Sequence, residues 1–115
     1  EAPNRNFVYA WADYRWTGSV GAYEIEYALL NQSGDTVRAV SKLTDHSGAT
    51  VDTYDEALAT AIAPNGRMGL LWYRYLYDYA SSAWNYNIYY AILDASGNVA
   101  VPPTNLTNNP YWGSG

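Results

Sequence analysis

The sequence contains two copies of one pattern, and this internal repeat constrains the fold more than any other feature. Residues 25–44 read IEYALLNQSGDTVRAVSKLT and residues 88–107 read IYYAILDASGNVAVPPTNLT, which align without a gap at an offset of 63 (88 minus 25). Earlier in each copy, Ala2-Pro3-Asn4 and Trp11 align with Ala63-Pro64-Asn65 and Trp72 at an offset of 61 (72 minus 11). The chain is therefore a repeat with a period of about 62 residues, and each copy should be one supersecondary unit.

Each copy reads as antiparallel strands joined by short turns. In residues 23–30, Tyr, Ile, Tyr and Leu alternate with Glu, Glu, Ala and Leu, a period of two that indicates a strand. Gly34 and Gly97 occupy the same place in their copies, where a glycine supplies the positive φ of a tight turn. The proline turns at residues 2–4 and 63–66 precede further strands. The predicted strands cover residues 6–12, 23–30, 36–43, 56–62, 68–74, 87–93 and 99–106.

Two features separate the outer from the inner strands of this meander. Pro102-Pro103 lacks the backbone N–H groups that a ladder needs, which places the strand over residues 99–106 at a sheet edge. Ala57, Ala59 and Ala61 put small side chains along one face of the strand over residues 56–62, as the crowded inner strand of a blade requires. Together they predict an all-β fold of antiparallel four-stranded meanders, the blades of a β-propeller.

Lettered from the innermost strand A to the outermost strand D, the chain reads B-C-D-A-B-C-D, or about 1.75 blades. An incomplete first repeat covers residues 1–50, a complete second repeat covers 51–108, and residues 109–115 begin a further repeat or form a tail. A small two-sheet β-sandwich is the alternative. Because closed propellers need roughly four to eight blades, we expect either a fragment of a larger propeller or several copies that assemble through strand edges.

The repeats support a resemblance to a known kind of protein. The phrase NIYYAILDASGNVAVPPTNLTNN, residues 87–109, together with APNGRMGLLWYR, residues 63–74, resembles the β-propeller-like repeats of secreted or surface proteins of bacteria such as the Chloroflexi. The first copy departs from this pattern, with Arg38-Ala39-Val40 where the second has Val101-Pro102-Pro103. The resemblance covers nearly the whole chain. It implies a propeller fold and an extracellular or cell-surface location, and no catalytic activity.

Composition limits the partners. Thirteen Tyr, five Trp and one Phe occur among 115 residues, which suits strands and binding surfaces and not disordered segments. The net charge of −5 comes without a Lys/Arg cluster, so nucleic acid and membrane insertion are not expected. No cysteine is present, which leaves neither a disulfide framework nor a Cys-based zinc site. The first residues, EAPNRNF, show neither the basic nor the apolar region of a signal peptide.

The aromatic residues gather around the long connections, at one end of the predicted meanders. Tyr and Trp beside Asn, Asp and Ser form a surface suited to sugar rings or protein partners when loops present them. The alternative is that these side chains pack loop against loop, or blade against blade. The residues predicted to bind a ligand are Tyr14, Trp16, Tyr75, Tyr77, Tyr79, Trp84 and Trp112.

Carboxylates offer an enzymatic alternative, because glycosidases work with paired acids. The candidate acids are Asp13, Asp45, Asp52, Asp55, Glu56 and Asp78. A solvated acidic loop is a far more common reason for such residues than a catalytic pair, and His46 reads as a surface loop residue. The turns NQSGD and DASGN lack the ligand pattern of a calcium loop, so neither a metal nor another cofactor is expected.

Two tripeptides match the N-glycosylation pattern, at Asn31 and Asn105, and both fall at a turn or an edge strand where a glycan could be attached. Taken together, the residues predict a non-enzymatic, extracellular structural or interaction module that displays an aromatic loop face. A carbohydrate-binding, lectin-like module is the first alternative, and a fragment of a propeller-fold glycoside hydrolase is the second. The expected partners are further blades or copies of the same chain, glycans and surface proteins.

Overall fold

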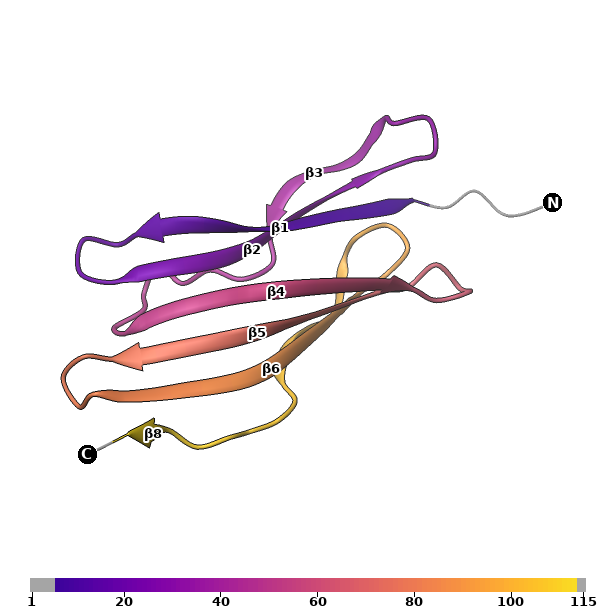
Figure 1. Cartoon of the computed structure of the whole chain (residues 1–115). Helices are drawn as coiled ribbons and strands as arrows, with labels where there is room; N and C mark the ends of the chain where they lie inside the picture. Colours follow the sequence, from indigo (N-terminus) through magenta and orange to yellow (C-terminus); the bar gives the residue numbers. More distant parts are fainter. Residues whose placement is uncertain (1–5, 114–115) are drawn as a thin grey trace.

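The computed structural model describes residues 6–113, and these residues form an all-β fold without a helix (Figure 1). One open, mixed sheet has the strand order β1-β2-β4-β5-β6-β7, with β3 added at β2 and β8 at β6. The strands are β1 (Phe7–Trp16), β2 (Gly21–Leu30), β3 (Thr36–Lys42), β4 (Asp52–Ile62), β5 (Met68–Asp78), β6 (Ala83–Leu93), β7 (Val99–Asn105) and β8 (Trp112–Gly113). Over the same residues, no helix is long and apolar enough to span a membrane.

Both repeats build the same antiparallel meander in the same register. The β1-β2 hairpin pairs Phe7 with Leu30, and the β5-β6 hairpin pairs their counterparts, Met68 and Leu93. Strands β3 and β7 then pair with β2 and β6 through equivalent partners, with register shifts at the same two places. The repeat in the sequence is therefore also a repeat of structure.

The turns between these strands are equivalent as well. The side-chain oxygen of Asn31 accepts hydrogen bonds from two later backbone N–H groups of its turn, and Asp94 does the same in the second copy. Gly34 and Gly97 have φ values of 85° and 89°, as the turn prediction required. A side-chain acceptor and a glycine thus set the same turn twice, although only Ser and Gly are shared at its centre.

The two repeats join through the start of β4. Ala22 and Tyr23 of β2 pair in parallel with Thr53 and Tyr54 of β4, while β3 pairs with the later part of β2. This parallel contact makes the sheet mixed and continuous from β1 to β7. Beyond it β4 bends at Ala57, which has a φ of 58° and lies in a register shift against β5. The two-sheet sandwich predicted as an alternative differs from this single hydrogen-bonded sheet.

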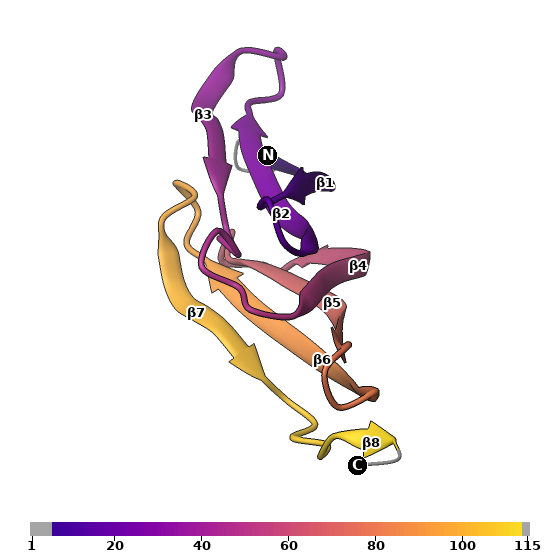
Figure 2. The same cartoon turned by 90° about the vertical axis from the view of Figure 1, so that its left-hand side faces the viewer.

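Away from that junction the two meanders pack face to face, one above the other in Figure 2. We define the front face of each repeat as the face that carries Tyr27 or Tyr90, and the back face as the one that carries Trp11 or Trp72. The core forms where the front face of the first repeat meets the back face of the second. Its buried members are Ile25, Tyr27, Leu29 and Leu43 from the first repeat and Met68, Leu70, Trp72, Ala91 and Leu93 from the second.

Polar contacts tie the same interface at the β6-β7 turn. The Tyr27 hydroxyl donates to the Gly97 carbonyl at 2.9 Å, and the Arg38 guanidinium donates to Asn98 at 3.1 Å. A Cβ built on Gly97 would stand 3.0 Å from Leu29 and 2.9 Å from Arg38. The second turn glycine is therefore needed for its close approach as well as for its φ.

The predicted strands all exist, but several are longer than predicted. Strand β1 continues to Trp16, β5 to Asp78, and β4 begins at Asp52 instead of residue 56. Residues assigned to long loops thus lie on strand ends. A short eighth strand, β8, occupies part of the expected tail. As predicted, β7 with its two prolines lies at an edge of the described sheet. The proline turn at residues 2–4 lies outside the described residues.

Candidate functional site

Five tyrosines form a continuous row across the junction between the repeats. Tyr14, Tyr23, Tyr54, Tyr75 and Tyr86 come from β1, β2, β4, β5 and β6, and each is the register partner of the next. Their ring centroids follow one another at 5.3, 5.5, 6.1 and 4.6 Å. Aromatic pairs at such distances are stabilising beyond their buried area. The row thus spans five strands of the sheet.

A second row runs parallel to the first, two residues nearer the ends of the same strands. Because side chains alternate between faces, these residues share the front face with the tyrosines. The second row consists of Trp16, Gly21, Asp52, Tyr77 and Trp84, and Trp112 of β8 pairs with Trp84. We call the two rows together the aromatic face.

Gly21 lets the rings of the first row converge. A Cβ built on it would stand 3.0 Å from the Tyr54 hydroxyl and 3.1 Å from the Tyr14 hydroxyl. Its backbone N–H donates to the Asp52 carboxylate at 3.0 Å. The middle of the aromatic face is therefore a polar site, with a buried carboxylate beside phenolic hydroxyls.

Burial and the Asp52 carboxylate raise the pKa of three phenols on this face. Burial raises the pKa of Tyr54 to about 12, and the neighbouring Asp52 carboxylate adds to the effect. Hydrogen bonding to Asp52 raises the pKa of Tyr79, and burial raises that of Tyr75. These raised pKa values show that the phenols of Tyr54 and Tyr79 interact with the Asp52 carboxylate.

All seven residues predicted to bind a ligand come together at this end of the sheet. Tyr14 and Tyr75 lie in the first row, and the second row includes Trp16, Tyr77 and Trp84, with Trp112 beside it. Tyr79 lies in the β5-β6 turn, with its ring 4.6 Å from that of Tyr77. Trp16, Tyr79 and Trp112 are strongly exposed. The prediction that loops present them was wrong for most, because the strands run further than expected.

The candidate site also contains residues that the prediction left out. Tyr23, Tyr54 and Tyr86 complete the first row, and Asp52 supplies its carboxylate. Tyr73, Tyr75 and Tyr77 already alternate in the sequence and mark one face of a strand. The partners of these residues depend on the β2-β4 contact, which no local pattern shows.

Asp55, another candidate acid, lies on the face opposite to the tyrosine row, where it forms ion pairs inside the protein. Its fully buried carboxylate lies 2.7 Å from Arg74 Nε and 2.6 Å from His46 Nε2. Burial alone would raise the pKa of Asp55, but the contacts with His46 and Arg74 outweigh it and lower the pKa. The prediction that His46 is a surface residue was wrong, since its side chain is only 10% exposed.

The other candidate acids are separated from one another. Asp45 and Asp78 each accept a backbone N–H in their own turns, from Ser47 and Ala80. Asp13 is exposed on β1, and Glu56 is exposed on β4 next to the bulge. Over the residues that the structure describes, no group of three or more His, Asp or Glu side chains could hold a metal ion.

The side chains of the two glycosylation candidates accept hydrogen bonds from nearby backbone N–H groups. Asn31 accepts from Ser33 and Asp35 in the β2-β3 turn, as described above. Asn105 ends β7, where its side-chain oxygen accepts the backbone N–H of Asn108. Both side chains are half-buried.

No protein-family model, curated protein or solved structure matches this chain. The resemblance to propeller-like bacterial surface repeats therefore stays a prediction.

Proposed function

We propose that this chain is a non-enzymatic structural and interaction repeat module, and that its binding surface is the aromatic face. The observation that carries the proposal is the row of five tyrosine rings, one from each of five adjacent strands, next to the exposed Trp16, Trp84 and Trp112. Exposed aromatic clusters of this kind mark interaction sites on soluble proteins. Tyr and Trp also lose little side-chain entropy when a ligand covers them.

The finer architecture that we propose is that of propeller blades. Its support is the repeated meander, with front face packed on back face and an edge strand on the outside. The extracellular or cell-surface location belongs to the same proposal, and it rests on the resemblance of residues 63–74 and 87–109 to bacterial surface repeats.

A glycan is the ligand class that one particular observation favours. Asp52 stands between rings, and its carboxylate interacts with the phenols of Tyr54 and Tyr79. Sugars offer apolar ring faces for stacking and hydroxyl groups for such donors and acceptors. A peptide partner would use the same rings without needing the carboxylate.

The test is binding of the dilute chain to a glycan array and to a peptide array. We expect wild type to bind members of one array, and Trp84→Ala to weaken that binding about tenfold, the equivalent of one stacking contact of roughly 1.4 kcal/mol. Trp11→Ala is the matched control, because Trp11 is exposed to nearly the same extent (37% against 38%) but lies on the back face of the first repeat.

Glycan hits that Asp52→Asn weakens would support the carbohydrate reading, and peptide hits that Asp52→Asn leaves unchanged would support a protein partner. Absence of binding to either array, or equal losses in Trp84→Ala and Trp11→Ala, would contradict the aromatic face as a binding surface.

A further inference from the structure

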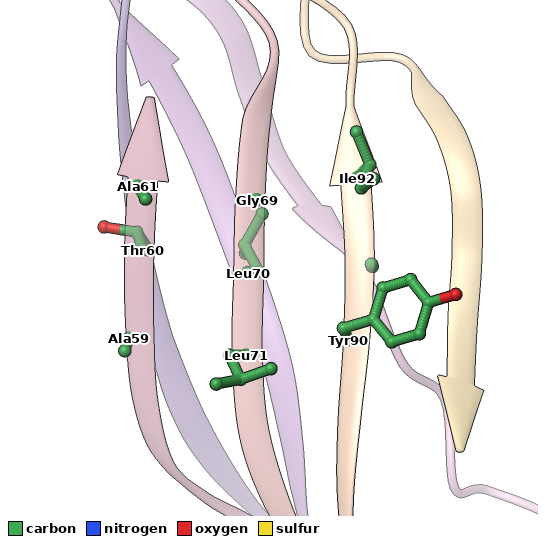
Figure 3. A pocket seen from close by; sticks show the side chains of 9 residues that line it. Ala59, Thr60, Ala61, Gly69, Leu70, Leu71, Tyr90 and Ile92 are labelled. Atoms are coloured by element: carbon green, nitrogen blue, oxygen red, sulfur yellow. The ribbon is translucent and has the colours of Figure 1, made fainter. Parts of the chain in front are cut away.

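An apolar groove lies on the front face of the second repeat. Three adjoining hollows of about 350, 370 and 110 Å³ run across β4, β5 and β6. They share lining residues, so they form one surface. Figure 3 shows the central part, where the side chains of Ala59, Ala61 and Leu71 lie near the open space left at Gly69, with Ile92 and Tyr90 on the neighbouring strand β6.

The equivalent face of the first repeat is already covered. Ile25, Tyr27 and Leu29 are 0%, 1% and 0% exposed because the back face of the second repeat packs on them. Their counterparts at an offset of 63 are Ile88, Tyr90 and Ile92, which are only half-buried. Leu43 and Leu106 differ in the same way, at 9% and 56% exposed. Along β5 and β6 the groove is therefore the receiving half of an interface that the molecule forms once internally, and β4, which has no counterpart in the described first repeat, lines its other side.

The other half of that interface, which we call the donating face, is a back face, and in the first repeat this back face is exposed. Met68, Leu70 and Trp72 on the back face of the second repeat are at most 1% exposed. Their counterparts at an offset of 61 on the back face of the first repeat are Phe7, Tyr9 and Trp11, which are 42%, 55% and 37% exposed. The apolar and aromatic character is kept at each position, and only the covering repeat is missing.

We propose that copies of this chain assemble head to tail, with the groove on the front face of the second repeat receiving the back face of the first repeat of a second copy. This contact reproduces between copies the packing that joins the two repeats within one copy. It is a heterologous contact, so it closes into a ring or extends as a filament, according to the rotation per copy. Two to four copies would reach the roughly four to eight blades of known propellers.

The internal interface predicts individual contacts of the new one. Tyr27 donates to the Gly97 carbonyl, so Tyr90 should donate to the carbonyl of Gly34 of the second copy. The environment of the two turn glycines agrees with this. A Cβ on Gly97 would clash with the first repeat, whereas a Cβ on Gly34 meets nothing within 4 Å in a single copy. The β2-β3 turn thus has the space for a neighbour.

This packing uses faces, whereas addition of a strand beside β1, the first strand in the described sheet order, would use backbone hydrogen bonds. The proposal rests on the proposed role as a structural repeat module and not on any ligand of the aromatic face. In the internal interface the tyrosine row stays uncovered, because the repeats join edge to edge there. Ligand binding and assembly are therefore separate measurements.

Sedimentation velocity of the wild-type chain over a wide concentration range provides the test. We expect species larger than one chain at high concentration. Leu71→Glu places a charge in the groove, and Tyr9→Glu places one on the opposite, donating face; both positions are exposed, so the fold should tolerate them. Each variant alone should be monomeric. Ser47→Glu adds the same charge in an exposed loop and should assemble like wild type.

The decisive sample is an equimolar mixture of the two variants. Each retains one intact half of the interface, so the mixture should form a heterodimer and nothing larger. Formation of that heterodimer also shows that both variants are folded. Tyr90→Phe keeps the ring and removes the hydroxyl, and we expect it to weaken assembly several-fold without abolishing it.

A wild-type chain that stays monomeric at all concentrations would overturn the proposal. So would dimers of either variant alone, since they would show a different contact. The Trp84→Ala variant separates this result from the proposed function: it should weaken array binding about tenfold and keep assembly. Loss of assembly in Trp84→Ala would place the contact at the aromatic face and contradict the groove.

Discussion

Strands β1, β2 and β3 of the first repeat have the same pairing register and the same turns as β5, β6 and β7 of the second, yet the two repeats bury opposite faces. The first covers its front face with the second repeat, and the second covers its back face with the first. Trp11 and Trp72 are counterparts in sequence and in the hairpin ladder, but one is 37% exposed and the other 1%. The backbone of a repeat is thus set within the repeat, whereas its burial is set by its neighbours.

Equivalent backbone N–H groups in the two repeats are accepted by different side chains, a carboxylate in the first repeat and an amide in the second. In the first, the buried Glu24 carboxylate accepts the backbone N–H of His46 and pairs with Arg15 and Lys42. In the second, its counterpart Asn87 accepts the backbone N–H of Asn109, 63 residues after His46, through a neutral amide. Burial alone would raise the pKa of Glu24, but its N–H and cationic partners lower it. The carboxylate of Glu24 is thus found at the connection between β3 and β4, which leads into the second repeat.

The largest expected difference between the repeats is in the loss of stability when the equivalent residues Trp72 and Trp11 are replaced by alanine. Trp72→Ala should lower the free energy of unfolding by about 3–5 kcal/mol, because it opens a cavity in the core. Trp11→Ala should cost about 1 kcal/mol or less in the monomer, since its ring is exposed. Urea unfolding at a dilute, monomeric concentration measures both. Equal losses would mean that the repeats do not pack front to back.

The next effect concerns an ion pair at the junction. Asp55→Asn should lower the free energy of unfolding by about 3 kcal/mol at neutral pH, because it leaves Arg74 without its carboxylate in a mostly buried place. Asp13→Asn is the control, as Asp13 is the exposed counterpart of Arg74 in the first repeat, and it should change the stability by about 0.5 kcal/mol or less. A similar loss in both variants would exclude a special role for the junction.

The same carboxylate predicts how stability depends on pH. The pKa of Asp55 is lower in the folded state than in the unfolded chain, so its stabilisation is fully present above the usual carboxyl pKa of about 4. The stabilisation is lost as pH falls through the lower, folded value. Urea unfolding in an acid pH series should show this fall in wild type and a shallower one in Asp55→Asn. Parallel curves would contradict it.

A smaller contrast separates the two turn glycines. Gly34→Ala should cost about 1–2 kcal/mol in the monomer, the usual penalty for a side chain at positive φ. Gly97→Ala has the same φ penalty and about 1–3 kcal/mol more, because the new Cβ would press on Leu29 and Arg38. Chemical denaturation of the dilute monomer compares them. A Gly34→Ala variant as damaged as Gly97→Ala would refute the difference in packing.

The smallest effect is a titration at the centre of the tyrosine row. Ultraviolet difference absorbance should show one phenol, Tyr54, ionising at a pKa of about 12. Since this value is raised in the folded state, its stabilising contribution is present below the usual tyrosine pKa of about 10 and is lost as pH rises towards the folded value. Tyr54→Phe identifies the group, and Asp52→Asn should lower its pKa. An unchanged titration in Asp52→Asn would show that the Asp52 carboxylate does not contribute to the raised pKa of Tyr54.

Much of this fold follows from local patterns. Alternation in residues 23–30 predicted a strand, Gly34 and Gly97 predicted turns with positive φ, and Pro102-Pro103 predicted an edge. The strand ends were predicted less well, because Tyr and Trp near a turn suit both a loop and a strand. The candidate site was predicted in part: its tyrosines could be named, but the row could not be assembled without knowing that β2 meets β4.

The sequence by itself thus determined the repeat, the strand order within it and the chemistry of its turns, since each depends on residues close together along the chain. The tertiary structure decided which copy of a face is buried, which acids find a cation and which tyrosines touch. Asp55, Arg74 and His46 show the reason, because their partnership comes from a loop and two strands that meet only after folding. The same strand register in two repeats therefore leaves one apolar groove and one aromatic back face exposed, and these are the surfaces that a second copy would cover.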